Sequence, residues 1–192
     1  MTTLPTVFIT GASSGIGATY AERFARRGHD LVLVARNKSR LDALAMRLRE
    51  QHQIAVEVLQ ADLTNSAELP ALETRLRHDA RIGILINNAG MLQSGHFLEQ
   101  SPEAIESQIA LNITALTRLA AAIAPRLAQS GTGSIVNIGS VVGFSPEFGI
   151  SLYGATKAYV LFLSQGLAHE LSPQGVYVQA VLPAATRTEI WA

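Results

Sequence analysis

Short apolar runs alternate with longer amphipathic segments along nearly the whole chain of 192 residues. The six apolar runs predict six strands, and the five segments between them predict helices. Strands that are separated by helices lie parallel, because each crossover helix returns the chain to the same edge of the sheet. The predicted strands are 7–10, 31–35, 54–59, 84–87, 134–139 and 176–182, and the predicted helices lie near 15–27, 38–51, 66–78, 102–129 and 154–171.

This alternation predicts an α/β fold with a doubly wound parallel sheet, which is a three-layer α/β/α Rossmann fold. The nearly continuous apolar runs are typical of strands with both faces buried. The run at 54–59 differs, because Glu57 interrupts it. This suits an edge position, which the third strand has in the order 3-2-1-4-5-6. No repeat or linker divides the chain, so residues 1–192 are predicted to form a single domain.

Charge is balanced, with 15 Lys and Arg against 15 Asp and Glu, which argues against a nucleic-acid arm or a polybasic membrane anchor. The absence of cysteine excludes disulfides and thiolate metal sites, and the five histidines form no short ligand pair, so no metal site is predicted. No secretory signal is recognisable, and no apolar run reaches the roughly 18 to 20 charge-free residues of a membrane helix. We therefore expect a cytoplasmic protein with no membrane or nucleic-acid partner.

A glycine-rich turn, Thr10-Gly-Ala-Ser-Ser-Gly-Ile-Gly17, follows the first predicted strand and precedes the first helix. A turn at this place lets the backbone approach a ligand, and the helix that follows presents free N–H groups suited to phosphate. The spacing differs from G-x-G-x-x-G, and a plain tight turn is the alternative; its place after the first strand favours a phosphate site. The candidate residues are Gly11, Ser13, Ser14, Gly15, Ile16 and Gly17.

The second predicted strand ends at Ala35, and Arg36 follows it. An acidic residue at this place would bind the adenosine ribose hydroxyls, whereas an arginine pairs with a 2′-phosphate through its planar fork. Arg36, with Lys38 and Arg40 close by, therefore favours NADP over NAD. The alternative is that Arg36 is a solvated loop cation.

Further along the chain lie Asn87-Asn88-Ala89-Gly90, Asn112, Ser140 and the pair Tyr153 and Lys157. The motifs T-G-x-x-x-G-x-G, N-N-A-G, an upstream Ser and Y-x-x-x-K occur here together and in order. In this respect the sequence resembles the short-chain dehydrogenase/reductase family, from the first strand through Thr188. The resemblance implies an NAD(P)-dependent oxidoreductase that oxidises an alcohol or reduces a carbonyl. It also implies a catalytic tetrad of Asn112, Ser140, Tyr153 and Lys157.

The residue types of this tetrad suit hydride transfer, which leaves charge on the carbonyl oxygen and requires a proton donor beside it. Tyr153 is the proposed donor, although the pKa of a free tyrosine is about 10. Lys157 falls on the same helix face. A cation at about 4 Å and an effective dielectric near 20 is worth roughly 4 kcal/mol, or about three pKa units, so we expect a lowered pKa for Tyr153. Ser140 would donate to the substrate oxygen, and the resemblance implies that Lys157 also holds the nicotinamide ribose.

Each of these residues has an alternative interpretation. Tyr153 and Lys157 have the spacing of a surface helix pair, and Ser140 suits a helix or turn cap. Asn112 suits a cap at a break in the predicted helix 102–129. An asparagine inside an apolar helical run is unusual, and the resemblance implies that it lies at a helix distortion and tethers a water leading to the lysine.

Other candidate cofactor residues rest on the resemblance. Asp62 matches the family's adenine-side aspartate, with a turn residue before the helix near 66–78 as the alternative. Asn88, Ala89 and Gly90 match the wall beneath the cofactor. The segment from Pro183 to Thr188 resembles P-G-x-x-x-T, which contacts the nicotinamide amide, except that Ala184 replaces the glycine. The resemblance assigns Pro183, Thr186 and Thr188 to the cofactor.

The last predicted strand, 176–182, would present an unprotected parallel edge. Family members continue with elements that cover this edge, so we expect that a natural C-terminal segment is missing from this sequence. Helices 102–129 and 154–171 are apolar on more than one side and resemble the family's dimer-forming pair, so a homodimer or homotetramer is expected. Apolar residues near the expected pocket favour a lipophilic carbonyl or alcohol, although core packing also explains them: Leu92, Val142, Phe144, Phe148, Ile190 and Trp191.

Two other functions remain open on the sequence. The first is a non-catalytic NADP-binding regulator or scaffold on the same fold, since a fold does not determine function. The second is an NADP-using lyase or epimerase, which would convert its substrate without net consumption of the cofactor.

The interpretation of Arg36 gives a direct test. Replacing Arg36 with Asp removes the cation and adds repulsion toward a 2′-phosphate, so the KM for NADP should rise far more than the KM for NAD. Steady-state kinetics with both cofactors measures the two changes. Equal changes in the two KM values would remove Arg36 from the phosphate site.

Overall fold

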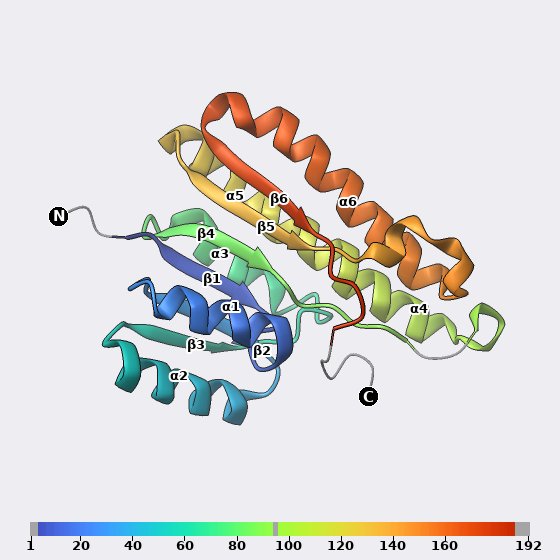
Figure 1. Ribbon diagram of the computed structural model, residues 1–192, viewed down its shortest axis with the longest axis horizontal. Coiled ribbons are helices and arrows are strands. Elements are labelled where there is room, and N and C mark those ends of the chain that lie inside the picture. The colour runs from blue at the N-terminus through green and yellow to red at the C-terminus, as the bar shows by residue number, and fades with distance from the viewer. Residues whose placement is uncertain (1–3, 94–95, 187–192) are drawn as a thin grey trace.

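Six parallel strands form one sheet in the order β3-β2-β1-β4-β5-β6 in the computed structural model, which describes residues 4–93 and 96–186 (Figure 1). All neighbouring pairs are parallel, and Ile9 of β1 lies between Leu33 of β2 and Ile86 of β4. The predicted doubly wound order is confirmed, with β3 at one edge. The strands are β1 (Thr6–Thr10), β2 (Leu31–Ala35), β3 (Val56–Gln60), β4 (Ile82–Asn87), β5 (Gly133–Ile138) and β6 (Val176–Val181).

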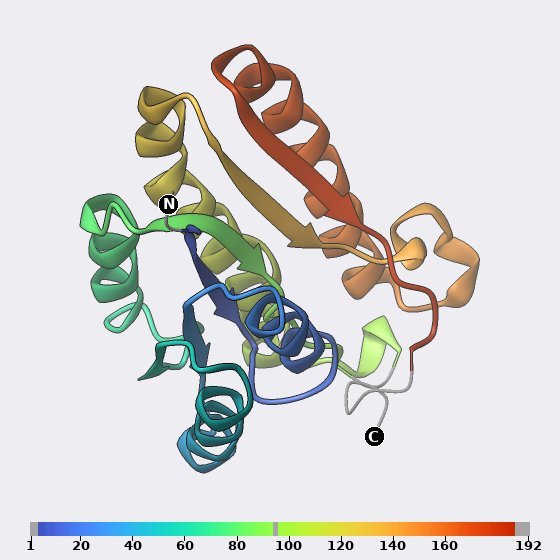
Figure 2. The same ribbon diagram turned by 60° about the vertical axis from the view of Figure 1, so that its left-hand side comes forward.

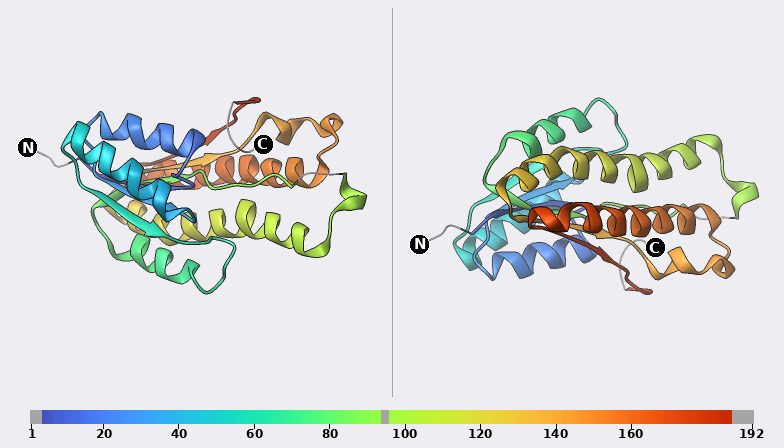
Figure 3. Two further views of the ribbon diagram at one scale, coloured as in Figure 1. Left: turned by 90° about the horizontal axis from the view of Figure 1, so that it is seen from below. Right: turned by 90° about the horizontal axis from the view of Figure 1, so that it is seen from above.

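Helices cover the sheet on two sides, as the views from below and above show (Figure 3). On one side lie α1 (Gly15–Ala25) and α2 (Lys38–His52), which pack on one face of the sheet. On the other side lie α3 (Leu69–His78), α5 (Leu116–Ser130) and α6 (Ser151–Leu171). The predicted three-layer α/β/α arrangement is therefore confirmed.

Burial on both faces explains the continuous apolar runs of the sequence. In β1, Val7 and Ile9 pack toward α1 and α2, whereas Phe8 between them packs toward α3 and α5. All three side chains are fully buried. Because successive side chains of a strand point to opposite faces, both faces of β1 must be apolar.

The predicted helix at 102–129 is interrupted. It consists of α4 (Pro102–Ile109), a π-helical segment η2 (Ala110–Ala115) and α5. Taken together, Pro102–Ser130 is long and apolar enough to cross a membrane by length and composition, with 50% of its most apolar window buried. Leu119 and Ile123 of this stretch are core residues, so it has the character of the core helix of a globular domain. Because Glu103, Glu106, Arg118 and Arg126 lie in this stretch, it holds no charge-free run of roughly 18 to 20 apolar residues, and the expectation from the sequence stands.

The carboxyl ends of the strands point the same way, toward one side of the molecule (Figure 2). Short connections leave from this edge: the glycine-rich turn after β1, the segment before α2, the turn after β3, and the loops after β4 and β5. The connection between β5 and α6 contains two 3₁₀ helices, η3 (Val141–Phe144) and η4 (Pro146–Phe148). Loops at the carboxyl edge of a doubly wound sheet are the usual location of a ligand site.

Truncation of a central core side chain tests this packing. Leu85 of β4 is fully buried between β1 and β5, so Leu85→Ala should lower the free energy of unfolding by about 2–5 kcal/mol. Met46 of α2 is 58% exposed, so Met46→Ala should change it by about 0.5 kcal/mol or less. Urea denaturation of both variants measures the difference. A Leu85→Ala cost no larger than that of Met46→Ala would contradict the central position of β4.

Candidate active site

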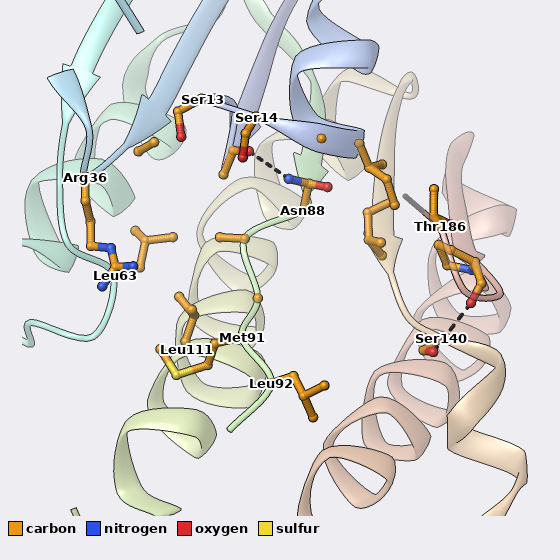
Figure 4. Close-up of a pocket in the computed structure, with 18 of the residues that line it drawn as sticks. Ser13, Ser14, Arg36, Leu63, Asn88, Met91, Leu92, Leu111, Ser140 and Thr186 are labelled. Carbon is orange, nitrogen blue, oxygen red and sulfur yellow. Dashed lines mark hydrogen bonds between the residues drawn. The ribbon is translucent and has the colours of Figure 1, made fainter. Parts of the chain in front are cut away.

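A cavity of about 540 Å³ lies at the carboxyl edge of the sheet (Figure 4). Arg36 and Leu63 lie at one end, Ser140 and Thr186 lie at the other, and the glycine-rich turn lies between them. Gly17 and Asn112 do not line the cavity, and Thr188 lies outside the described residues. The other sequence-predicted site residues all line it: Gly11, Ser13, Ser14, Gly15, Ile16, Arg36, Asp62, Asn88, Ala89, Gly90, Ser140, Tyr153, Lys157, Pro183 and Thr186.

The glycine-rich turn packs so closely on the end of β4 that side chains are excluded. A Cβ on Gly11 would lie 2.7 Å from Nδ2 of Asn88, and φ of Gly11 is +63°. A Cβ on Gly17 would lie 2.3 Å from the carbonyl oxygen of Gly11. Gly17 therefore has a packing role beneath the turn, and its contact with a cofactor stays a prediction.

Hydrogen bonds join the turn to the end of β4. Asn88 Nδ2 donates to the carbonyl oxygens of Thr10 and Gly11, both at 3.0 Å. Thr10 Oγ1 accepts from the backbone N–H groups of Asn88 and Ala89, again at 3.0 Å. Thus the Asn88 side chain fastens the turn, while Ala89 and Gly90 continue along the cavity wall.

The first turn of α1 is open to an anion. Its N-cap residue, Ser14, makes no side-chain capping hydrogen bond, and no acidic residue lies in the first turn. Free N–H groups and the positive end of the helix dipole suit a phosphate group. Together with the close-packed glycines, this arrangement provides space and donors for the pyrophosphate of a dinucleotide.

The other end of the cavity carries positive charge. Arg36 and Arg40 line it, and both are exposed. Lys38 does not line the cavity and instead pairs with Asp42 on α2, with 2.6 Å between Nζ and Oδ2. The predicted basic group is therefore two arginines, because the helical turn of α2 directs Lys38 along the helix.

Asp62 lies beside this end and forms a local turn. Its Oδ1 accepts hydrogen bonds from the backbone N–H of Thr64 at 2.9 Å and from Thr64 Oγ1 at 2.7 Å. Burial raises the pKa of Asp62, but these hydrogen bonds and the charge of Arg36 outweigh it and leave the pKa below its ordinary value. Asp62 is therefore a turn residue that also lines the cavity, and its place beside an adenine stays a prediction.

Asn112 lies inside the π-helical segment η2 and is buried. Its Oδ1 accepts from the N–H of Met91 at 2.9 Å, and its Nδ2 donates to the carbonyl oxygen of Met91 at 2.9 Å. The helix distortion that the resemblance implied is thus present, and the capping interpretation is wrong. A Cβ on Gly90 would lie 3.4 Å from both Asn112 Oδ1 and Lys157 Nζ. Gly90 lines the cavity and Asn112 does not, so Asn112 lies behind the backbone of Gly90.

Tyr153 and Lys157 are 6% and 4% exposed, so the alternative of a surface helix pair is wrong. Lys157 Nζ donates to the carbonyl oxygen of Ile138 at 2.8 Å and lies 5.5 Å from the centroid of the Tyr153 ring. Ser140 Oγ donates to the carbonyl oxygen of Pro183 at 3.5 Å, and Ser140 lies close enough to Tyr153 to lower the pKa of the phenol. Ser140 Oγ also accepts from the N–H of Val142 at 3.3 Å, so the capping role of Ser140 is confirmed beside its place in the cavity.

The expected lowering of the Tyr153 pKa is wrong for this structure. Burial raises the pKa of Tyr153 above its ordinary value, and the nearby Ser140 offsets only part of this effect. Burial also lowers the pKa of Lys157 to about 8. Lys157 Nζ donates to the carbonyl oxygen of Ile138 beside the tyrosine ring, and the desolvation of the phenol decides the direction in which the pKa of Tyr153 moves.

The apolar residues that the sequence analysis placed near the pocket lie in different surroundings. Leu92 lines the cavity, and Val142 is buried. Phe144 and Phe148 lie at the surface, each 62% exposed, and Ile190 and Trp191 lie outside the described residues. Sequence reasoning missed Leu63, Met91 and Leu111, which also line the cavity. Each of them is next in the sequence to a predicted site residue, Asp62, Gly90 or Asn112, and this adjacency could have indicated them.

Comparison with known proteins agrees with this geometry. A family model described as short chain dehydrogenase matches residues 5–192. An uncharacterized oxidoreductase of Staphylococcus saprophyticus is 37% identical over 183 residues, covering 95% of this chain and 78% of that protein. The very-long-chain 3-oxoacyl-CoA reductase-B of Danio rerio is 33% identical over 186 residues, and the match covers 95% of this chain but 60% of that protein.

Two solved structures are more similar. A short-chain dehydrogenase from Sphingobium yanoikuyae in complex with NADPH is 79% identical with a TM-score of 0.97, over 98% of this chain and 73% of that one. The bulky-bulky ketone specific alcohol dehydrogenase from Comamonas testosteroni is 68% identical with a TM-score of 0.96, over 97% of this chain and 74% of that one. The chain belongs to the short-chain dehydrogenase family and is by class an oxidoreductase.

The depressed pKa of Lys157 predicts a pH dependence of stability without nucleotide. The folded-state pKa is about 8 and the unfolded value about 10.4, so between them the unfolded chain binds more protons. The free energy of unfolding should therefore rise with pH across this window, relative to Lys157→Met, by on the order of 3 kcal/mol. Wild type and Lys157→Met both contain Tyr153, so the difference between their free energies of unfolding reports the titration of Lys157.

Denaturant titrations at pH values from 7 to about 10.5 measure this difference. A gap between wild type and Lys157→Met that stays constant across the window would contradict the depressed pKa.

Proposed function

We propose that this chain binds NADP and transfers a hydride between the nicotinamide and the carbon of a carbonyl or secondary alcohol. The observation that carries the proposal is that Tyr153, Ser140 and Lys157 line the same cavity as the glycine-rich turn. A phenol that would donate a proton and a turn that would bind a dinucleotide therefore line one cavity at the carboxyl edge of the sheet. We also propose that residues 1–192 belong to one domain built on this sheet.

NADP rather than NAD is supported by Arg36 and Arg40 at the adenosine end of the cavity, where two guanidinium groups suit a 2′-phosphate. The relative from Sphingobium yanoikuyae is in complex with NADPH, which agrees with this preference. The open first turn of α1 would hold the pyrophosphate. Pro183, Thr186 and Gly90, which all line the cavity, would border the nicotinamide end.

The cofactor supplies the hydride, and the chain's own residues handle the proton and the oxygen. Tyr153 would donate its proton to the substrate oxygen as negative charge develops there. The raised pKa of Tyr153 keeps the phenol protonated near neutral pH, which suits a donor in the reductive direction. Ser140 would hydrogen-bond the same oxygen, and Lys157 would hold the ribose and bring positive charge toward the phenol. Asn112 would hold the wall at Met91.

A lipophilic and bulky ketone or alcohol is the proposed substrate class. Leu92 lines the cavity, and the loops after β5 present Phe144 and Phe148 at the surface. The Comamonas testosteroni relative carries the description bulky-bulky ketone specific. We further propose a cytoplasmic homodimer or homotetramer, supported by apolar side chains at the surface of α4 and α6, among them Ile109 and Phe162.

Removing the hydroxyl group of Tyr153 tests its assignment as the proton donor. Tyr153→Phe should lower kcat with NADPH and a bulky aromatic ketone by about 10² to 10⁴, because the proton donor is lost. The Kd for NADPH should stay within about twofold, because the rest of the cavity is unchanged. Tyr159→Phe is the matched control, since Tyr159 lies on the same helix and its hydroxyl contacts Thr117 away from the cavity.

NADPH oxidation and product formation are followed together. Substantial reductase activity in Tyr153→Phe would defeat the proton-donor assignment. NADPH binding by the wild type without turnover of any carbonyl would favour the regulator or scaffold. Conversion of substrate without net NADPH consumption would favour a lyase or epimerase.

A further inference from the structure

We infer that Thr156 is a positioning residue, which sets the spacing between the two walls of the active-site cavity through Asn112. The inference rests on the proposed function, since the walls matter only where a hydride acceptor binds between them. One wall is α6, which carries Tyr153 and Lys157, and the other is the segment after β4 that contains Gly90, Met91 and Leu92. Thr156 itself is 1% exposed and does not line the cavity, so it touches neither substrate nor cofactor.

The Thr156 hydroxyl joins two elements that are 44 residues apart in the sequence. Thr156 Oγ1 donates to the carbonyl oxygen of Tyr153 at 2.8 Å. It also accepts from Asn112 Nδ2 at 3.0 Å, across the interface between α6 and η2. A hydroxyl is the smallest side-chain group that can donate and accept at the same time. Valine has the same shape and can do neither.

The Asn112 amide carries the connection to the opposite wall. One hydrogen bond joins its Oδ1 to the N–H of Met91, and its Nδ2 donates to both Met91 and Thr156. Both N–H hydrogens therefore have an acceptor, and both backbone polar groups of Met91 have a partner. A continuous line of hydrogen bonds runs from the carbonyl of Tyr153 through Thr156 and Asn112 to Met91.

A purely local role does not account for this geometry. Threonine hydroxyls inside helices often bond back to the carbonyl three or four residues earlier, and the bond to Tyr153 belongs to that class. The bond from Asn112 does not, because it crosses between elements and uses the acceptor side of the hydroxyl. Without it, a buried N–H of Asn112 would lose its partner, and α6 would lose its polar tie to η2 at the level of Tyr153.

The same helix offers a matched control two turns further on. Ser164 Oγ donates to the carbonyl oxygen of Val160 at 2.7 Å and accepts from Asn137 Nδ2 at 2.9 Å. Ser164 is also buried, so it repeats the bonding pattern of Thr156 at a place with no contact to the cavity. Ser164→Ala thus removes a buried hydroxyl of the same kind without touching the cavity walls.

Kinetics of the variants tests the functional part. Thr156→Val should lower kcat with NADPH and a bulky ketone by about tenfold, with the KM for NADPH within about twofold of wild type. Thr156→Ser keeps the hydroxyl, so its kcat should lie within about twofold of the wild-type value. The kcat of Ser164→Ala should also lie within about twofold of the wild-type value. A kcat for Thr156→Val near that of wild type would overturn the inference, and so would an equal loss in Ser164→Ala.

Hydrogen exchange of the Asn112 side-chain amide, followed by NMR on asparagine-labelled protein without nucleotide, gives a readout independent of activity. Exchange should speed up about tenfold or more in Thr156→Val and stay unchanged in Ser164→Ala. Unchanged exchange in Thr156→Val would overturn the inference even if activity falls. If the wild type turns over no carbonyl, the proposed function fails, while this readout still decides whether Thr156 holds Asn112.

Thr156→Ala is the second variant, with the same expectations, in case Thr156→Val does not fold. Thermal denaturation of every variant shows which are folded. If both substitutions prevent folding while Thr156→Ser folds, Thr156 is a structural residue and the positioning role is rejected.

Discussion

The hydrogen bonds between Thr10 and Asn88 join the carboxyl ends of the two central strands, β1 and β4, and the glycine-rich turn and the cavity wall after β4 are positioned from that junction. Asn88 also bonds the carbonyl of Gly11, so the turn after β1 is held against the wall after β4. The contact is so close that a side chain at Gly11 or Gly17 would overlap it. The glycines of this turn have no side chains, which leaves space for a phosphate group to approach the first turn of α1.

A second constraint is the burial of charge and phenol at the other side of the cavity. Burial raises the pKa of Tyr153 and lowers that of Lys157 to about 8, so at neutral pH the phenol is protonated and the lysine is still mostly an ammonium group. The lysine is held by the carbonyl of Ile138 at the end of β5, which keeps its ammonium group beside the tyrosine ring. Displacements between α6 and β5 would change both pKa values together. The hydrogen bonds of Thr156 and Ser164 join α6 to η2 and to β5, respectively.

Much of the fold followed from the sequence because hydrophobic periodicity reports burial directly. The run from Leu31 to Ala35 predicted β2 with its observed bounds, and Glu57 indicated the edge strand. The π-helical segment around Asn112 was indicated only by the resemblance, because a π-turn depends on how the helix packs. Gly17 was assigned to the cofactor, and the structure adds its close packing on Gly11, because close packing and ligand contact both favour glycine. Lys38 was grouped with Arg36, although its partner Asp42 lies one turn further along the same helix.

The sequence by itself determined the class of fold, the order of the motifs and the residue types of the site, because these depend on local pattern and on chemistry carried by single side chains. Tertiary structure alone decided the protonation tendencies of Tyr153 and Lys157, since a pKa depends on desolvation by distant parts of the chain. It also decided that Thr156 meets Asn112, because a hydrogen bond across 44 residues exists only once the helices have packed.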